Sequence, residues 1–260
     1  MITAPADWHS QKTYRCRMEW GRRGARVAAE RGDILVVVDV LSFSTTVVTA
    51  AAHGVIVYPC DKDGETAAIL AARVGAEVAV ARRDVPKKGR FSLSPKTFAA
   101  APRGAKVVLA SPNGATCSRF GRDVPRLFVG ALVNAEAVAR AVLAALNESD
   151  SAVTLLACGE RWTDPADAAE DGELRFAVED YVGVGAILAH LPADLSRSPE
   201  ARAAEAIFHE VGGELDDLLL GCGSGIELRG RGYENDVRHA ACLNQYDVAP
   251  VLKGGERFEA

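Results

Sequence analysis

Short apolar runs, each followed by a polar turn or a helix-like segment, recur along the chain. They are rich in β-branched residues and do not alternate with polar ones, a pattern typical of strands buried on both faces of a sheet. Such runs predict strands at residues 13–20, 34–41, 55–60, 77–81, 106–110, 126–129 and 152–157. The segments between and after them predict helices at residues 24–30, 44–53, 64–75, 115–120, 134–147, 175–190, 199–211 and 214–220. This alternation predicts a three-layer α/β/α fold around a mixed, largely parallel sheet.

We interpret the predicted units as one α/β domain that spans residues 1–260. Residues 1–12 are expected to form a loose terminus. Residues 161–173 are acidic and contain a proline, which predicts an exposed loop insertion. A solvated face is the first interpretation of this loop, and a metal-binding lid is the alternative. The glycine-rich segment at residues 221–252 is polar enough to line a cleft.

Composition narrows the class of protein. The net charge of −5 argues against general nucleic-acid binding, which favours a basic surface. No apolar run approaches the roughly 18 residues of a membrane span, and the first residues lack the apolar core of a signal peptide. The six cysteines show no close metal-type spacing. We therefore expect reduced thiols in a cytoplasmic protein without membrane or nucleic-acid partners, and a homo-oligomer stays an open option.

Residues 34–54, ILVVVDVLSFSTTVVTAAAHG, contain the first candidate site. The apolar run ends in the carboxylate of Asp39. A series of hydroxyl groups follows at Ser42, Ser44, Thr45 and Thr46. Ligands of open α/β sheets bind outside the carboxyl ends of the strands, and a carboxylate beside a helix N-terminus can hold a metal and a phosphate together. Capping of the next helix by Asp39 is the alternative.

Residues 111–116, SPNGAT, form a second polar turn between a predicted strand and a predicted helix. Asn113 and Gly114 can take the positive φ values of a tight turn. Such a turn would direct Asn113, Thr116 and several N–H groups at one ligand. The alternative is that the same residues form a purely structural turn between the strand and the helix. If the strands before Asp39 and Asn113 run parallel, the two turns leave the same sheet edge. The similarity of the two units also leaves open a fold of two related halves.

Glu179 and Asp180 are adjacent acids in the otherwise apolar segment RFAVEDYVGVGAI. Burying two carboxylates is costly unless they are paired or bound to a metal. Metal binding or catalysis is therefore the first interpretation. The alternative is that both acids favour the start of a helix.

Several short motifs also occur in a fixed order between residues 30 and 252. The set comprises DVLSFSTT, LSP, SPNGAT, VNAEA, ACG with FAVEDYVG, and a C-terminal series of Ser, Gly, Asp, Cys, Asp and Pro. The set resembles the motifs of the 2-phosphosulfolactate phosphatase family, among them D-V-L-R-A-[ST]-[ST]-T, T-x-N-G-T and C-A-G. Each motif is short, and the order makes the resemblance specific.

The resemblance implies an α/β fold and Mg²⁺-dependent hydrolysis of a small phosphorylated, sulfonated hydroxy acid. Carried over by position, it implies catalytic and metal-binding roles for Asp39, Glu179 and Asp180. We assign substrate binding to Ser42, Ser44, Thr45, Asn113, Gly114, Thr116, Arg82 and Arg83. The motifs leave open whether water or a protein group attacks phosphorus.

Three departures from the family pattern concern the substrate. Ser42 stands where the family has Arg after D-V-L, Ala81 begins ARR in place of G-E-R, and Leu93 replaces the Asn of G-N-S-P. A serine cannot supply the charge or the planar fork with which arginine binds phosphate or sulfonate. We therefore predict weak or no turnover of 2-phosphosulfolactate.

The missing charge has three candidate sources in the chain, Arg82, Arg83 and Arg175. The sequence as a whole predicts a Mg²⁺-dependent phosphatase acting on a small phosphate monoester, with altered substrate-binding residues. A non-catalytic small-anion-binding member of the same fold is the first alternative. A purely structural oligomeric α/β protein is the second.

Overall fold

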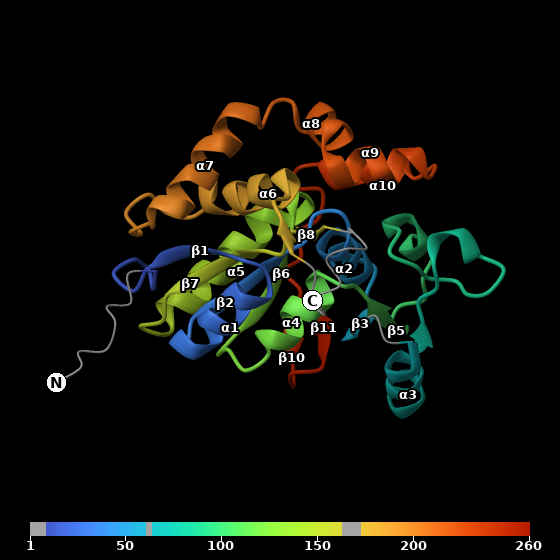
Figure 1. Ribbon diagram of the computed structural model, residues 1–260. Coiled ribbons are helices and arrows are strands. Elements are labelled where there is room, and N and C mark those ends of the chain that lie inside the picture. The colour runs from blue at the N-terminus through green and yellow to red at the C-terminus, as the bar shows by residue number, and fades with distance from the viewer. Residues whose placement is uncertain (1–8, 61–63, 163–172) are drawn as a thin grey trace.

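The computed structural model describes residues 9–60, 64–162 and 173–260 (Figure 1). Most of the predicted loose terminus and acidic loop insertion lies outside these residues. The strands are β1 (Cys16–Trp20), β2 (Ile34–Val38), β3 (Ile56–Cys60), β4 (Glu77–Val78), β5 (Lys106–Ala110), β6 (Leu127–Gly130), β7 (Val153–Ala157), β8 (Glu160–Arg161), β9 (Leu174–Arg175), β10 (Val251–Lys253) and β11 (Arg257–Glu259). The α-helices are α1 (Gly21–Arg31), α2 (Phe43–Ala52), α3 (Gly64–Val74), α4 (Gly114–Phe120), α5 (Ala135–Asn147), α6 (Val178–Ala189), α7 (Pro199–Val211), α8 (Leu215–Gly221), α9 (Gly223–Gly230) and α10 (Glu234–Ala241). Three 3-10 helices are η1 (Arg82–Asp84), η2 (Pro95–Phe98) and η3 (Leu132–Asn134).

Nine of the strands form one mixed sheet in the order β1-β7-β2-β6-β10-β11-β3-β5-β4. Strands β1, β7, β2 and β6 pair in parallel, and so do β3, β5 and β4. The C-terminal hairpin β10–β11 pairs antiparallel with both groups. The last residues of the chain therefore join two parallel half-sheets. The large mixed sheet and its helical layers confirm the predicted fold class.

The two half-sheets run in opposite directions, because three antiparallel pairings lie between β6 and β3. The condition that β2 and β5 run parallel is therefore not met, yet the turns that follow them meet at Asp39. We attribute the meeting to sheet twist. A rotation of about 20–25° at each strand step, over the five steps from β2 to β5 in this order, amounts to roughly 100–125°, which brings both carboxyl ends toward one region.

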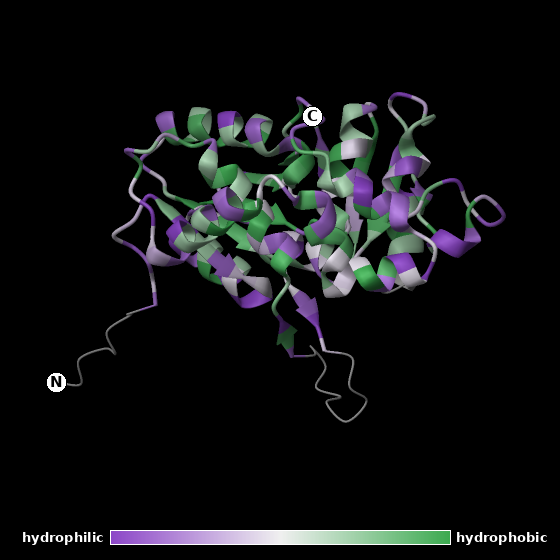
Figure 2. Ribbon diagram, turned by 90° about the horizontal axis from the view of Figure 1, so that it is seen from above, coloured by the Kyte–Doolittle hydropathy of each residue, from purple (hydrophilic) through white to green (hydrophobic). Residues whose placement is uncertain are grey.

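Alternate residues of β2 face the two helical layers. Val36 and Val38 belong to a buried cluster with residues of α5, α6 and α7. Leu35 and Val37 belong to a second cluster with residues of α1, α2 and α4. This is the period-two geometry of a strand, and it explains why the run is apolar at every position. Figure 2 shows the apolar segments gathered at the centre, with polar helical positions outside.

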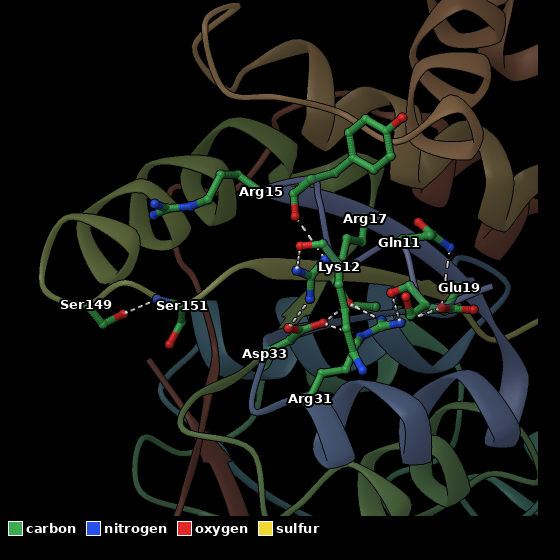
Figure 3. Close-up of polar contacts among 12 residues, drawn as sticks. Gln11, Lys12, Arg15, Arg17, Glu19, Arg31, Asp33, Ser149 and Ser151 are labelled. Carbon is green, nitrogen blue, oxygen red and sulfur yellow. Dashed lines mark hydrogen bonds and ion pairs between the residues drawn. The ribbon is translucent and has the colours of Figure 1, made fainter. Parts of the chain in front are cut away.

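A cluster of buried ion pairs lies at the amino-terminal edge of the first half-sheet (Figure 3). The Asp33 carboxylate, which precedes β2, accepts hydrogen bonds from Arg17 at 2.6 Å and Arg31 at 2.9 Å. It also accepts one from the Thr154 hydroxyl at 2.6 Å. Arg31 additionally pairs with Glu19 at 2.9 Å. The cluster connects β1, α1, β2 and β7. It lies at the edge of the sheet opposite the carboxyl ends of these three strands.

The predicted strands and helices are all present, with shifts of a few residues at their ends. The glycine-rich segment near residue 221 forms helices α9 and α10, and its residues Leu228, Arg231 and Tyr233 line a cavity. A Cβ on Gly225 would overlap the Leu219 carbonyl oxygen, so this glycine allows α8 and α9 to approach closely and does not mark an open turn. The hairpins β8–β9 and β10–β11 have strands of two or three residues, too short to produce a pattern in the sequence. No helix in the described segments is long and apolar enough to cross a membrane.

Candidate active site

The Asp39 carboxylate connects the loop after β2 with the turn after β5. It is 5% exposed. Its Oδ1 accepts the Phe43 N–H at 3.1 Å, and its Oδ2 accepts the Gly114 N–H at 2.8 Å. The Ser111 hydroxyl donates to Oδ2 at 3.4 Å. Two turns that are far apart in the sequence thus share one buried acid.

Asp180, in the first turn of α6, holds a third loop in the same region. Its Oδ1 accepts the Val40 N–H at 2.8 Å, and its Oδ2 accepts the Gly159 N–H at 2.9 Å. Burial and the charges of Asp39 and Glu179 raise the pKa of Asp180 well above its usual range. Because a backbone N–H group binds each carboxylate oxygen, Asp180 positions the loops after β2 and β7.

Glu179 is buried beside Asp180 at the start of α6. Burial raises the pKa of Asp39, two backbone hydrogen bonds oppose this shift, and repulsion from Glu179 adds to it. The structure thus brings the three predicted acids, Asp39, Glu179 and Asp180, into one buried cluster. Capping of α6 alone does not account for this cluster, because Asp180 accepts its two N–H groups from other loops.

Glu160 is a fourth acid of this cluster, and the sequence interpretation did not include it. Burial and the charges of Asp39 and Glu179 raise the pKa of its carboxyl to about 7, against the effects of Asn113 and Arg175. Its Oε2 accepts the Asn113 Nδ2–H at 2.9 Å, and its Oε1 accepts the Ser224 hydroxyl at 3.3 Å. Its position three residues after the end of β7 was the signal that could have found it.

The Asn113 side chain points into the acid cluster through its amide. Its Oδ1 is buried and has no hydrogen-bond partner within the described residues. The expected positive φ is wrong, because Asn113 has φ −106° and Gly114 does not have positive φ either. Gly114 is instead required by close packing, since a Cβ there would overlap the Phe43 ring and lie 2.8 Å from Asp39 Oδ2. Its N–H is already taken by Asp39.

The predicted hydroxyl ligands bond mainly to the protein backbone. The Ser44 hydroxyl donates to the Val37 carbonyl at 3.1 Å and accepts the Asp39 N–H at 2.9 Å. The Thr45 hydroxyl donates to the Val40 carbonyl at 2.8 Å. The third hydroxyl of this kind, that of Thr116, donates to the Ser111 carbonyl at 3.3 Å. These bonds stabilise the two turns that present Asp39 and Asn113.

A guanidinium group is present at Ser42 after all, and it comes from η1. Arg82 Nη2 donates to the Ser42 hydroxyl at 2.7 Å, and Arg82 Nε pairs with the buried Asp236 at 3.0 Å. Arg83 is exposed on the same short helix. Arg175 is the register partner of Glu160 in the antiparallel pairing of β8 and β9.

The oxygen donors of this region fit a partly hydrated Mg²⁺ better than a closed metal cage. In the described part of the chain, no three Asp, Glu, His or Cys side chains are arranged to hold a metal ion by themselves. Mg²⁺ usually takes one or two carboxylates, substrate phosphate and several waters. Asp39 and Glu179 lie close enough for their charges to interact, and Asn113 Oδ1 has no partner among the described residues, so these are the oxygen atoms that would hold such an ion.

The fold and the buried acid cluster define an α/β protein with a polar site where its strands end. A family model described as 2-phosphosulpholactate phosphatase matches residues 24–255. The chain therefore belongs to this family of phosphoric monoester hydrolases, and the family and enzyme class predicted from the motifs are confirmed.

Two relatives illustrate the similarity. The 2-phosphosulfolactate phosphatase of Methanocaldococcus jannaschii is 28% identical over 235 residues, which cover 85% of this chain and 90% of that protein. The probable 2-phosphosulfolactate phosphatase of Deinococcus radiodurans is 29% identical over 234 residues, covering 88% of this chain and 91% of that protein. Both similarities extend over most of each chain.

Proposed function

We propose that the protein is a Mg²⁺-dependent phosphatase that hydrolyses a small phosphate monoester. The observation that carries the proposal is the gathering of Asp39, Glu160, Glu179 and Asp180. Asn113 bonds to Glu160 through its amide nitrogen, and its own amide oxygen has no partner among the described residues. Three buried acids and a fourth that is partly buried are costly to place together unless a cation or protons compensate their charge. The family to which the chain belongs supplies the reaction class.

Each residue has a separate role in this proposal. Asp39, Glu179 and the Asn113 amide oxygen hold Mg²⁺, and Asp180 positions the loops that carry them. When bound, the ion neutralises negative charge on the phosphoryl oxygens. The short contacts from Ser44, Thr45 and Thr116 to the backbone keep the two turns rigid, so little reorganisation is needed when the substrate binds.

Glu160 is proposed to donate a proton to the leaving oxygen of the ester. A carboxyl with a pKa of about 7 retains its proton over much of the neutral range, which an ordinary glutamate does not. The Asn113 amide and the Ser224 hydroxyl hold its two oxygens in place. Because the acid must be protonated to act, the rate should fall as the pH rises through the pKa of Glu160. That pKa is about 7 without the ion and is lower when Mg²⁺ offsets the charges of Asp39 and Glu179.

The test measures phosphate release by the full chain from a series of small phosphate monoesters, including 2-phosphosulfolactate, with Mg²⁺ and with EDTA. Glu160→Gln should lower kcat by roughly two orders of magnitude or more and abolish the decline with rising pH. Glu179→Gln should raise the Mg²⁺ concentration needed for half-maximal rate. The matched control is Glu136→Gln, an exposed acid that pairs with Arg140 and should behave as the parent protein.

Two results would contradict the proposal. Hydrolysis that is unaffected by EDTA would exclude the metal. Phosphate binding without turnover of any ester would instead support the non-catalytic anion-binding alternative.

A further inference from the structure

A cavity of about 630 Å³ lies at the amino-terminal edge of the first half-sheet, at the ion-pair cluster around Asp33. Its wall is formed by parts of residues 12–17 around the start of β1, residues 30–33 before β2 and residues 150–152 before β7. The volume falls within the range of small-molecule sites. Four basic side chains line the cavity, those of Lys12, Arg15, Arg17 and Arg31.

Arg17 is fixed in this wall with N–H groups left over. Its side chain is 8% exposed. Nε donates to the Tyr14 carbonyl at 2.9 Å, Nη1 to Asp33 at 2.6 Å, and Nη2 to the Lys12 carbonyl at 2.9 Å. A guanidinium group has five N–H donors. Two of those of Arg17 therefore meet no acceptor within the described residues.

Arg15 is the second fixed cation, and its side chain has no hydrogen bond or ion pair within the described residues. Its Nε is buried and unpartnered. Figure 3 shows Arg15 directed to the side of the loop that carries Ser149 and Ser151, whereas Arg17 and Arg31 converge on Asp33. A cation that only complemented the end of α5 would donate to the last carbonyl groups of that helix, and Arg15 donates to none of those described.

The acids of this region leave the Arg15 charge without a partner. Asp33 and Glu19 balance Arg17 and Arg31. The other two acids in the wall, Glu30 and Asp150, are exposed, and Glu30 faces Arg23 at 4.0 Å.

Water and salt screen exposed charges far more than buried ones. A buried N–H group without an acceptor also costs free energy. The inner wall of the cavity therefore favours an anionic acceptor from outside the chain.

We propose that this cavity binds a small oxyanion with at least two negative charges between the guanidinium groups of Arg15 and Arg17. The planar fork of arginine matches such oxyanions, and charge-assisted hydrogen bonds to them are strong. The ligand would join the segments that precede β1, β2 and β7, so its binding stabilises the folded chain. The cavity lies at the sheet edge opposite Asp39, and the inference is independent of the proposed reaction.

The test uses pyrophosphate as the probe, in EDTA and at constant ionic strength, so that the acid cluster cannot hold it through Mg²⁺. Its affinity for the full chain is measured by titration calorimetry, together with the thermal midpoint at increasing pyrophosphate concentration. Arg15→Gln should weaken binding roughly tenfold or more. Pyrophosphate should raise the midpoint of the parent protein and should change that of Arg15→Gln much less. Arg15→Lys keeps the charge but loses the fork, and its affinity should be intermediate.

Two further variants locate the binding. Arg23→Gln removes an exposed arginine whose ion pair is 4.0 Å long, and this matched control should bind as the parent protein does. Arg82→Gln removes the guanidinium at Ser42 and should also leave the affinity unchanged. Loss of binding in Arg82→Gln but not in Arg15→Gln would assign the probe to the candidate active site and overturn the inference. Absence of binding by the parent protein, or equal affinities in the parent and Arg15→Gln, would overturn it as well.

Discussion

The buried acids of this site are held mainly by backbone N–H groups. Asp39 and Asp180 each accept two of them, and each accepts at least one from a distant part of the chain. Hydrogen bonds to a carboxylate are stronger than those between neutral groups, and they favour the ionised form. Burial and neighbouring acids oppose that preference, so the two residues are under opposing electrostatic demands that a cation would relieve.

Gly114 is the residue at which this arrangement is most sensitive to volume. In Gly114→Ala the added Cβ would overlap the Phe43 ring and press on Asp39 Oδ2. Overpacking of this kind typically costs about 1–3 kcal/mol, and it should also displace the Asp39 carboxylate. We expect a lower urea midpoint together with weaker Mg²⁺-dependent phosphate release.

Gly213→Ala is the matched control, because a Cβ there meets nothing within 4 Å. It should leave both stability and phosphate release close to those of the parent protein. If Gly114→Ala kept the stability and activity of the parent, close packing at Asp39 would not be what requires a glycine.

The elements of the first half-sheet are held together at their amino-terminal edge by the ion-pair cluster around Asp33 (Figure 3). Arg17 and Arg31 come from β1 and α1, and Thr154 comes from β7. The cluster faces away from the carboxyl ends of these strands. It therefore supports the site only through the sheet itself.

Asp33→Ala tests this separation of stability from chemistry. It leaves two buried guanidinium groups without their shared carboxylate, and breaking a buried pair in this way typically costs about 3–5 kcal/mol. The thermal midpoint should fall sharply, while kcat per folded molecule should change little at temperatures below the transition.

Glu30→Ala removes an exposed carboxylate whose contact with Arg23 is 4.0 Å long. Exposed pairs contribute at most about 1 kcal/mol, so this variant serves as the control. A comparable loss of stability in both variants would show that the buried position of Asp33 has no special importance.

The whole molecule depends on the C-terminal hairpin, which joins the two half-sheets. Phe258 of β11 is fully buried, pairs with Val57 of β3, and lies 6.3 Å from the Phe43 ring, measured between ring centroids. Phe43 begins the helix that follows Asp39. The end of the chain is thus packed against the element that positions the site.

Phe258→Ala should therefore reduce both stability and activity. Truncation of a buried Phe typically costs about 3–5 kcal/mol, and the loss of support for Phe43 should loosen the start of α2. The measurements are chemical unfolding and phosphate release at saturating Mg²⁺. Phe176→Ala, at a side chain that is 58% exposed, is the control. Normal activity in folded Phe258→Ala protein would show that the hairpin does not position the site.

Local pattern was sufficient to predict most elements and the family. Runs such as ILVVV before Asp39 show burial on both faces, and the order of short motifs identified the chain's relatives. The same pattern also predicted that Asp39, Glu179 and Asp180 lie together in one site. Carboxylates within apolar segments are costly to bury unless they are paired or bound to a cation.

Tertiary structure alone decided three other features. It reversed the second half-sheet through a hairpin whose strands are too short to show periodicity, and it still brought the turns after β2 and β5 together. It added Glu160, whose raised pKa depends on neighbours that are distant in sequence. It placed Arg82 at Ser42 across 40 residues. The hydrophobic pattern of a segment indicates which of its faces is buried. These contacts depend instead on sheet twist and on packing between segments that are far apart in the sequence, so no single segment predicts them.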